Sequence, residues 1–402
     1  MDTNAKIEEL LTRGVEDVFV RENLLAKLRS GKKLRVKLGF DPTGSKIHIG
    51  RAIVLRKLKA FQDLGHTIVF IVGDFTARVG DPSDKLEKRP MLAKEVIKEN
   101  LKNYKKQVGK IIDVGKAEFV FNSKWLSKLG FEEIARLAES FSVSQMSNRR
   151  NFKERLDRGE EVSLREFMYP LMQGYDSVAV KADVELGGFD QLFNLKAGRI
   201  VQKHFGKLEQ DVLTTQMLEG TDGRKMSTSW GNVINITDEP NDMFGKLMSL
   251  KDELTPKYFL LCTDVSLPEI ERMKMETASG KLNPRDAKLS LGEEIVKIYH
   301  GEKSARKAKE NFLATFSEGK LPEDIKEFKA EKGVLLSDCL LSAGLIASKN
   351  EWRRLVGEGA VSILASDGQS KQGQKITDPN FKIGASAVFK IGKHRFLKIS
   401  AN

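Results

Sequence analysis

One stretch of the chain alternates between strand and helix patterns in a way that is typical of a parallel β-sheet. Residues 34–40 (LRVKLGF) have the pattern of a buried strand, and residues 41–45 (DPTGS) are rich in turn formers. Apolar residues then recur at helical spacing from about residue 48 to 64, and residues 67–72 (TIVFIV) have the pattern of a second strand. Consecutive strands joined through a helix lie parallel in one sheet. The stretch therefore predicts a crossover unit.

The same alternation continues through the first half of the chain. Further helical patterns cover residues 92–108, 132–140, 166–178 and 190–204, and strand patterns cover residues 117–121 and 211–217. This order predicts an α/β fold, with a Rossmann-type doubly wound parallel sheet over residues 1–220. We expect residues 1–30 to form one helix. The polar, basic residues 141–165 are expected to form an insertion or a mobile connection.

The pattern changes after residue 220. Residues 221–316 contain a glycine-flanked loop and then mostly amphipathic helical patterns, which predict an α-helical domain. Residues 317–333 are charged and contain glycine and proline, as expected of a linker. Residues 334–402 combine short helical patterns with strand patterns and predict a small α+β domain.

Composition limits the class of protein and its partners. The net charge of +12 indicates either a polyanionic partner or a lysine-rich, solubilising surface, and charge alone does not separate the two. The apolar runs are far shorter than the roughly 20 residues of a membrane span, and the first thirty residues lack the apolar core of a signal peptide. Cys262 and Cys339 have no metal-ligand spacing and suit a reducing cytoplasm. We expect a cytoplasmic protein with no membrane segment and no protein-bound metal.

The first candidate site lies in the run FDPTGSKIHIG, residues 40–50. His48 and Gly50 fall where a helix is expected to begin, and a helix N-terminus offers free N–H groups and positive potential to phosphates. A histidine there can donate to a phosphate oxygen, and a glycine lets a nucleotide approach the backbone. Thr43 can donate to phosphate, and Asp41 can accept from a ligand amine. Taken singly, a histidine beside a glycine at a helix start is more often only a capping feature.

The second candidate is the run KMSTS, residues 225–229, which has glycines on both sides. Such a loop can close over a pyrophosphate, with the lysine supplying charge and the hydroxyls supplying donors. Alone, it would be interpreted as a solvated turn. Between the two runs, Tyr169, Gln173 and Asp176 are spaced to share one helix face. That face predicts either a polar ligand pocket or a solvated surface.

Together and in this order, the two runs resemble the signatures of one enzyme family. The run at residues 40–50 resembles the HIGH signature of class I aminoacyl-tRNA synthetases, and its framing GFDPT is similar to that of bacterial tyrosyl-tRNA synthetases. The run at 225–229 resembles their KMSKS loop. The resemblance implies ATP as a substrate, accompanied by Mg²⁺. It implies catalytic roles for His48, Gly50, Arg51, Thr43, Lys225 and Thr228.

The resemblance also implies how the substrates are held. By this resemblance, the ATP-binding residues of the chain would be His48, Gly50, Gly188, Asp190, Lys225, Met226, Ser227, Thr228 and Ser229. Its tyrosine-binding residues would be Gly39, Asp41, Asp81, Tyr169, Gln173, Asp176 and Gln191. Tyr169 and Gln173, helped by Asp81, would hold the substrate ammonium, and Asp176 would accept the phenolic hydroxyl. Gly188 would let the ribose approach, and Asp190 would bond its hydroxyls.

Four positions depart from the family pattern. Arg51 stands where a second histidine is usual, and Thr228 where a second lysine is usual. Lys37 stands four residues before Asp41, where many relatives have a tyrosine that contacts the substrate hydroxyl. Asp84 replaces a usual glycine.

The C-terminal module carries concentrated positive charge. Between residues 334 and 400, ten Lys and Arg oppose five Asp and Glu, a net charge of +5. The module resembles the small RNA-binding domain appended to bacterial tyrosyl-tRNA synthetases, and its charge suits contact with phosphates. The residues implied to contact tRNA are Lys85, Arg89, Arg353 and Arg354. For Lys85 and Arg89, a solvated basic turn is an equal alternative. By the same analogy the helices at 240–315 would meet the anticodon.

The resemblance implies activation of L-tyrosine by ATP, followed by transfer of the tyrosyl group to tRNA(Tyr). It also implies a homodimer, with an interface at about residues 110–160. Two alternatives remain open. A tryptophanyl-tRNA synthetase shares the fold and both signatures, and the carboxylate of Asp176 would also accept an indole N–H. The departures at Arg51 and Thr228 allow a synthetase-like RNA-binding protein without catalysis.

Overall fold

The structure is a computed structural model of the 402-residue chain. It describes residues 2–83, 91–317, 325–346, 348–364, 373–392 and 395–401. The chain divides into two compact units. The first comprises Met1–Thr237 and Pro256–Glu271, and the second comprises Asp238–Thr255 and Arg272–Asn402.

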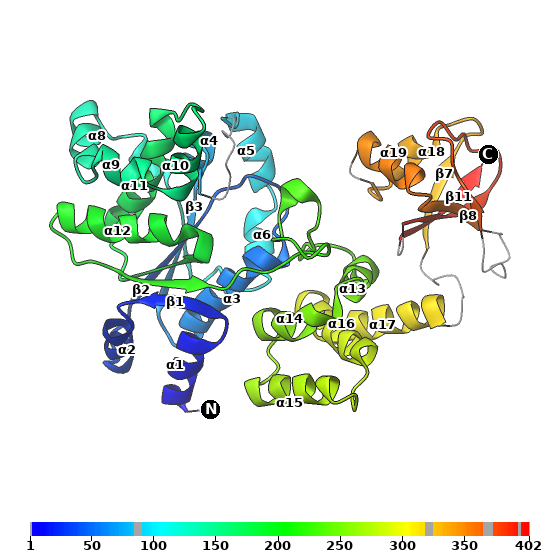
Figure 1. The fold of residues 1–402 in the computed structure, drawn as a ribbon, viewed down its shortest axis with the longest axis horizontal. Helices are drawn as coiled ribbons and strands as arrows, with labels where there is room; N and C mark the ends of the chain where they lie inside the picture. The colour runs from blue at the N-terminus through cyan, green and yellow to red at the C-terminus, as the bar shows by residue number, and fades with distance from the viewer. Residues whose placement is uncertain are drawn as a thin grey trace. The chain divides into compact units, whose positions relative to one another are not determined.

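The first unit is built on a six-stranded sheet with the strand order β1-β6-β5-β2-β3-β4 (Figure 1). The strands are β1 (Val15–Phe19), β2 (Arg35–Phe40), β3 (Thr67–Val72), β4 (Glu118–Phe121), β5 (Val184–Gly188) and β6 (Asp211–Thr215). All neighbours pair in parallel except β1, which pairs antiparallel to β6 at one edge. The predicted Rossmann-type α/β class is confirmed, and the sheet is mixed because of this edge strand.

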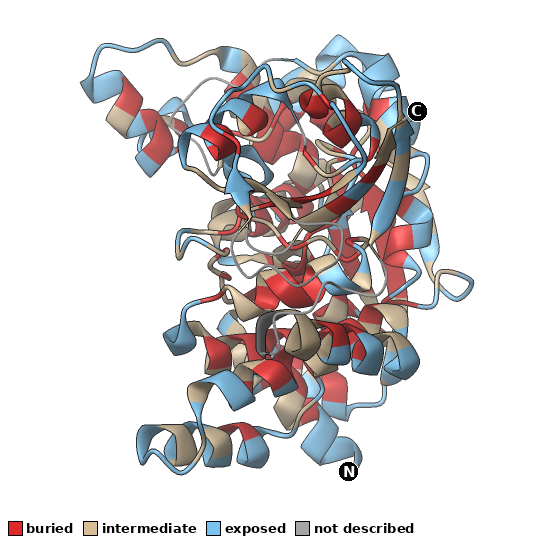
Figure 2. Cartoon of the chain, turned by 90° about the vertical axis from the view of Figure 1, so that its right-hand side faces the viewer, coloured by how far each residue is buried: buried red, intermediate tan, exposed pale blue. Residues whose placement is uncertain are grey.

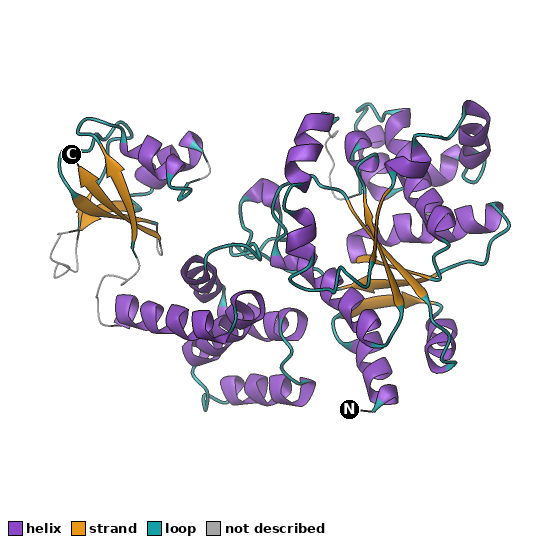
Figure 3. Ribbon diagram, turned by 180° about the vertical axis from the view of Figure 1, so that it is seen from behind, coloured by secondary structure: helices purple, strands orange, loops and turns teal. Residues whose placement is uncertain are grey.

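Helices lie on both faces of the sheet, with buried residues on their inner sides (Figures 2 and 3). The helices of the first unit up to β4 are α1 (Thr3–Thr12), α2 (Arg21–Arg29), α3 (Ile49–Asp63), α4 (Thr76–Val79), α5 (Lys94–Leu101) and α6 (Tyr104–Val108). Those after β4 are α7 (Ser123–Leu126), α8 (Phe131–Ala138), α9 (Val143–Ser147), α10 (Arg150–Asp157), α11 (Leu164–Val180), η1 (Phe189–Gln191), α12 (Leu192–His204), η2 (Thr228–Trp230) and α14 (Thr255–Cys262). Strands covered on both faces have the near-continuous apolar runs seen in residues 67–72.

Two expectations for the first unit are wrong. Residues 1–30 do not form one helix, because Gly14 and Val20 adopt positive φ angles of 62° each and the segment between them forms β1. For residues 141–165 the mobile connection is wrong, since they contain α9, α10 and the start of α11, while the alternative of an insertion stays a prediction. Arg149, between α9 and α10, is buried, and its guanidinium lies over the ring of Phe193 at 4.2 Å.

The second unit contains helices and a small separate sheet. The helices are α13 (Pro240–Met248), η3 (Asp252–Leu254), α16 (Pro284–His300), α17 (Glu302–Ser317), α18 (Leu336–Ser342) and α19 (Lys349–Gly357), while α15 (Leu267–Ala278) spans the division between the units. The strands are β7 (Lys326–Ala330), β8 (Val361–Leu364), β9 (Gln374–Lys375), β10 (Ala387–Ile391) and β11 (Arg395–Ala401), in the order β7-β11-β10-β8-β9. This sheet, α18 and α19 share a core around Trp352. The last part of the expected linker is a strand, because β7 pairs in parallel with β11. In the described parts of the chain, no helix is long and apolar enough to cross a membrane.

Candidate active site

A cavity of about 460 Å³ opens in the first unit where several parallel strands end. Its walls include the end of β2, the end of β5 and the residues around Thr215 at the end of β6. In the sheet, β5 and β2 are neighbours. From β2 the chain adds β3 and then β4 on one side, and from β5 it adds β6 on the opposite side. Ligands of open α/β sheets bind outside the carboxyl ends of strands at such a reversal point. The cavity is therefore placed where this fold class binds ligands.

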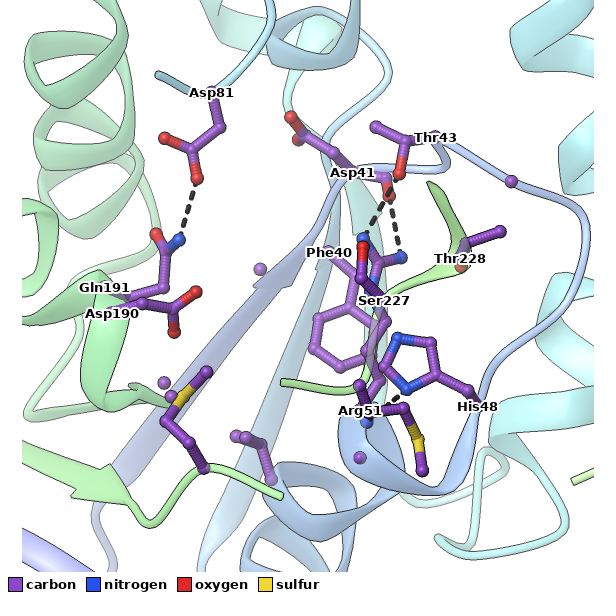
Figure 4. Close-up of a pocket in the computed structure, with 18 of the residues that line it drawn as sticks. Phe40, Asp41, Thr43, His48, Arg51, Asp81, Asp190, Gln191, Ser227 and Thr228 are labelled. Atoms are coloured by element: carbon purple, nitrogen blue, oxygen red, sulfur yellow. Dashed lines mark hydrogen bonds between the residues drawn. The ribbon is translucent and has the colours of Figure 1, made fainter. Parts of the chain in front are cut away.

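His48 marks the start of α3 on one side of the cavity (Figure 4). It occupies the N-cap, and its Nδ1 accepts a hydrogen bond from the backbone N–H of Arg51 at 3.3 Å. Burial lowers the pKa of His48 to about 3, helped by the charges of Arg51 and Lys225. At neutral pH the imidazole is thus uncharged, and because Nδ1 accepts, the proton lies on Nε2. His48 can offer one N–H donor to an anion.

Backbone hydrogen bonds join the first signature segment to residues that follow the second one. The N–H of Ile49 donates to the carbonyl of Ile234 at 2.8 Å, and the N–H of Ile236 donates to the carbonyl of Ile47 at 2.9 Å. Close packing supports the same junction, because a Cβ on Gly50 would lie 3.1 Å from His48 Nδ1 and 3.4 Å from the sulfur of Met226. Residues far apart in the chain are thereby fixed on one side of the cavity, where Ser227 and Thr228 face His48 (Figure 4).

Asn232 holds the loop that carries Lys225. Its Oδ1 accepts from the backbone N–H of Ser227 at 2.8 Å, and its Nδ2 donates to the carbonyl of Lys225 at 3.0 Å. The ammonium of Lys225 lies 2.9 Å from Asp190 Oδ2. A nucleotide that uses Asp190 for its ribose and Lys225 for its phosphates would have to separate this pair.

Arg51 lines the cavity (Figure 4). Its guanidinium donates to Thr43 Oγ1 at 3.2 Å and to the carbonyl of Asp41 at 3.5 Å, and it lies 5.7 Å from the ring centroid of Phe40. These contacts tie α3 to the loop after β2. The residue that replaces the usual second histidine thus adds a cation to the lining of the cavity beside His48.

Carboxylates gather at another part of the cavity. Asp41 accepts from Thr76 Oγ1 at 2.7 Å and from the hydroxyl of Tyr169 at 3.0 Å. Burial raises the pKa of Asp41 to about 7, while these two hydrogen bonds act in the opposite direction. Asp81 accepts from Gln191 Nε2 at 2.7 Å (Figure 4). Two carboxylates and a phenol facing one cavity suit a ligand that carries an ammonium group.

Asp176 does not line the cavity with the other predicted residues. It is buried behind Tyr169 and Gln173 on α11, and its two oxygens accept from Trp125 Nε1 at 2.7 Å and from Asn122 Nδ2 at 3.3 Å. Burial raises the pKa of Asp176 to about 6. A carboxylate has lone pairs for a third donor after accepting these two. Its reading of a substrate hydroxyl therefore stays a prediction.

The structure brings most of the predicted residues to this one cavity. Its lining includes Gly39, Asp41, Thr43, His48, Gly50, Arg51, Asp81, Tyr169, Gln173, Gly188, Asp190, Gln191, Lys225, Met226, Ser227, Thr228 and Ser229. Arg353 and Arg354 are exposed on α19 of the second unit, where Arg354 pairs with Glu358 at 2.9 Å. Lys85, Arg89 and the departure at Asp84 lie outside the described residues. The individual roles of these residues stay predictions.

The residues that support the cavity from behind belong to no sequence motif. Asn232 fixes the loop, Asn122 and Trp125 engage Asp176, and Glu185 accepts from Gln173. Only Asn232 had a local signal, a polar residue just after the glycine-flanked run. Within the described ranges, no group of three or more His, Cys, Asp or Glu is arranged to hold a metal ion.

Comparison with known proteins indicates the same enzyme family as the residues that line the cavity. A family model described as tRNA synthetases class I (W and Y) matches residues 29–317. The chain is 46% identical over 405 residues to a tyrosine–tRNA ligase of Carboxydothermus hydrogenoformans, with 97% of each chain covered. It is 44% identical over 397 residues to a tyrosine–tRNA ligase of Thermotoga maritima, which covers 98% of this chain and 96% of that relative.

Solved structures support the fold. A C-terminally truncated mitochondrial tyrosyl-tRNA synthetase of Aspergillus nidulans superposes with a TM-score of 0.63 at 24% identity, covering 77% of this chain and 94% of that chain. A tyrosyl-tRNA synthetase of Archaeoglobus fulgidus, complexed with L-tyrosine, superposes with a TM-score of 0.61 at 22% identity, covering 77% of this chain and 100% of that chain. The chain belongs to the class I aminoacyl-tRNA synthetases, the ATP-using ligases of protein biosynthesis, in the branch that comprises the tryptophan and tyrosine enzymes.

Proposed function

We propose that the protein is a tyrosine–tRNA ligase that activates L-tyrosine with ATP and transfers the tyrosyl group to the 3′ end of tRNA(Tyr). The observation that carries this proposal is the joining of residues 47–50 to residues 225–236 around one cavity with an acidic part. The nearly full-length relatives that bear this function support it.

In the first step the tyrosine carboxylate attacks the α-phosphorus of ATP, and pyrophosphate leaves with the electrons of the broken P–O bond. The Nε2–H of His48, the ammonium of Lys225 and the N-terminus of α3 would stabilise negative charge on the phosphates. Mg²⁺ would enter with ATP as part of the substrate, bound mainly by phosphate oxygens. In the second step a terminal ribose hydroxyl of the tRNA attacks the acyl carbon, and AMP leaves. The protein contributes positioning and charge stabilisation and no covalent nucleophile.

The acidic part of the cavity supports binding of an amino acid. Tyr169, Gln173 and Asp81 would surround the substrate ammonium, with Asp41 beside Tyr169. Gly188 and Asp190 would meet the ribose, and a Cβ on Gly188 would lie 2.7 Å from Asp190 Oδ1, so the backbone is close to that carboxylate. Asp176, at the far side of Tyr169 and Gln173, offers a hydrogen-bond acceptor. This favours binding of a substrate with a phenol group over one with a plain aromatic ring.

Tyrosine use is expected to depend on pH through Asp41. Its pKa of about 7 means that the carboxyl group changes from mostly neutral to mostly ionised between pH 6 and pH 8. Because only the ionised form attracts an ammonium fully, we expect kcat/KM for tyrosine in ATP–pyrophosphate exchange to rise across this range. Asp41→Asn should lower kcat/KM and remove the part of the rise above pH 7, where Asp176, with a pKa of about 6, is already mostly ionised. A wild-type profile that falls or stays flat would contradict this role of Asp41.

The parts of the chain that follow the catalytic domain are proposed to bind tRNA. We propose a catalytic domain over residues 1–220, the signature loop and an anticodon-binding helical domain over 221–316, a linker over 317–325, and an RNA-binding domain over 326–402 that includes β7 because this strand pairs with β11. Exposure of Arg353 and Arg354 supports the last assignment, and Lys85 and Arg89 are further candidates for the acceptor end.

Truncation tests the role of the C-terminal domain together with the transfer reaction. A chain ending at residue 325 loses β7 together with the sheet in which it pairs. It is expected to form tyrosyl-adenylate at the wild-type rate, and its charging of unfractionated tRNA with labelled tyrosine should fall at least about ten-fold at physiological salt, because phosphate contacts are lost. Full-length protein carrying Arg353→Ala and Arg354→Ala is the matched variant with the fold retained. Equal charging by the truncated and full-length chains would refute the role. Failure of the full-length chain to charge tRNA with tyrosine would refute the proposed function.

We also propose a homodimer whose interface includes residues 110–160. Support comes from large apolar side chains that the single chain leaves exposed, since Phe131 is 89% and Val143 is 75% exposed. Sedimentation equilibrium at micromolar concentration would return the mass of two chains, and a monomer would contradict the proposal. A cytoplasmic location remains a prediction from the sequence.

A further inference from the structure

A buried ion pair lies directly behind the cavity. Lys37 on β2 and Glu185 on β5 are register partners in the parallel sheet, so their side chains point to the same face. The ammonium of Lys37 lies 2.9 Å from Glu185 Oε1, and the two side chains are 0% and 1% exposed. Neither residue lines the cavity. The pair thus contacts no substrate directly.

Every donor of this lysine and both oxygens of this glutamate are used. Lys37 also donates to Ser177 Oγ at 2.8 Å and to the backbone carbonyl of Gln173 at 2.9 Å. Glu185 accepts from Ser177 Oγ at 3.1 Å and from Gln210 Nε2 as well. Gly198 on α12 leaves room for the side chains of Gln210 and Glu185, because a Cβ there would lie 2.3 Å from Gln210 Nε2 and 3.0 Å from Glu185 Oε2. The network ties α11 to the sheet.

The pair determines which end of the Gln173 amide faces the cavity. Gln173 lines the cavity, and the nitrogen of its side chain donates to Glu185 Oε1 at 3.0 Å. An ionised carboxylate only accepts hydrogen bonds, so the amide end beside Glu185 must be the NH₂ group. The carbonyl oxygen is left as the other end. If the amide were reversed, a donor would face the substrate ammonium, which is itself a donor.

We propose that the Lys37–Glu185 pair is a positioning device that holds the Gln173 carbonyl oxygen toward the ammonium of the amino-acid substrate. The inference rests on the proposed function, since it requires an ammonium-bearing ligand in this cavity. Lys37 supplies the counter-charge of Glu185 within the protein interior, and the Glu185 carboxylate, which accepts from the Gln173 nitrogen, fixes the amide. The residue that departs from the family pattern four positions before Asp41 thereby acts on substrate binding through Gln173.

The first test replaces the pair with apolar residues of similar size. In Lys37→Met/Glu185→Leu both charges are removed together, so no unpaired charge is buried. The nitrogen of Gln173 loses the carboxylate to which it donates. We expect the dissociation constants of L-tyrosine and tyramine, measured by calorimetry, to rise by about ten- to a hundred-fold, the loss of one hydrogen bond to a charged group. Binding of 3-(4-hydroxyphenyl)propionate, which lacks the ammonium, and the KM of ATP should not change. Equal weakening of all three ligands, or weakening of none, would overturn the proposal.

A second variant, Gln173→Glu, is tested first with the ion pair intact and then with the ion pair replaced. Gln173→Glu adds a negative charge facing the ammonium, yet in the wild-type background it also faces Glu185 and should weaken tyrosine binding. In the Lys37→Met/Glu185→Leu background the same substitution should restore binding, because a carboxylate presents an oxygen at either end. Tighter binding of tyrosine by Gln173→Glu in the wild-type background would overturn the proposal, even if the apolar pair did not fold.

A matched control separates positioning from general loss of buried charge. Arg155 and Glu166 form another buried ion pair, with Nη1 and Oε1 2.6 Å apart and each side chain 3% exposed, and Glu166 lies on α11 like Gln173. Arg155→Met/Glu166→Leu should leave the preference for tyrosine over 3-(4-hydroxyphenyl)propionate unchanged. If this control lost the preference as strongly, the effect would belong to the helix and the proposal would fail. A wild-type chain that binds no tyrosine would refute the proposed function itself.

Discussion

Lys225→Ala is expected to lower kcat for adenylate formation by about 10²–10³-fold, the cost of removing one donor that faces transition-state charge. Lys225 lines the cavity and is held by a loop that Asn232 ties down. With Thr228 in place of a second lysine, fewer cations share the phosphate charge. We expect the KM of ATP to stay constant or fall, because the substitution also frees Asp190 from its 2.9 Å contact with Lys225.

The measurement is single-turnover formation of tyrosyl-adenylate with both substrates saturating. Lys257→Ala is a suitable control, since Lys257 pairs with Glu219 at 2.9 Å near the same loop and does not line the cavity. It should leave kcat unchanged. An equal loss in both variants would mean that charge near the loop acts non-specifically. Wild-type kcat in Lys225→Ala would remove Lys225 from the catalytic residues.

Asp176→Ala is expected to lower kcat/KM for tyrosine by about ten- to a hundred-fold, the range for losing a hydrogen bond to a charged acceptor. Phenylalanine brings no hydroxyl, so its kcat/KM should change far less, and the preference for tyrosine should fall accordingly. The substitution also leaves the Trp125 and Asn122 donors without their acceptor, which should cost about 1–3 kcal/mol in the free energy of unfolding.

The ratio of the two kcat/KM values in ATP–pyrophosphate exchange separates these effects. Asp74→Ala is the matched control, because Asp74 accepts from Ser123 Oγ at 2.6 Å at the start of α7, the helix that carries Trp125, and does not line the cavity. It should lower stability and leave the ratio unchanged. An unchanged ratio in Asp176→Ala would show that another group reads the hydroxyl.

Local patterns were sufficient wherever one element follows another along the chain. The strand at residues 67–72 has the predicted bounds, and His48 caps α3 as its position before an amphipathic run indicates. These features depend on periodicity and on capping residues, which a single sequence contains. The association of the two signature segments was expected from the resemblance to the synthetase family, because each segment taken alone indicates only a turn or a helix cap.

Features that depend on sheet register were not predictable. Lys37 was recognised as a departure, but its partner Glu185 lies on another strand, and only the register of β2 with β5 brings them together. The burial of Arg149 was also missed, because a basic stretch has the composition of a solvated surface. Its stacking on Phe193 and its hydrogen bond to Asn194 require two segments far apart in the sequence, the α9–α10 connection and α12, to meet.

The central claim is that this cavity activates tyrosine, and ATP–pyrophosphate exchange with separate amino acids tests it most directly. Purified full-length chain should exchange pyrophosphate with L-tyrosine, and exchange with L-tryptophan or L-phenylalanine should be lower by orders of magnitude. Exchange with tryptophan alone would contradict the tyrosine assignment and favour the other enzyme of this branch. No exchange with any amino acid, together with tight binding of tRNA, would contradict the account and favour an RNA-binding protein without catalysis.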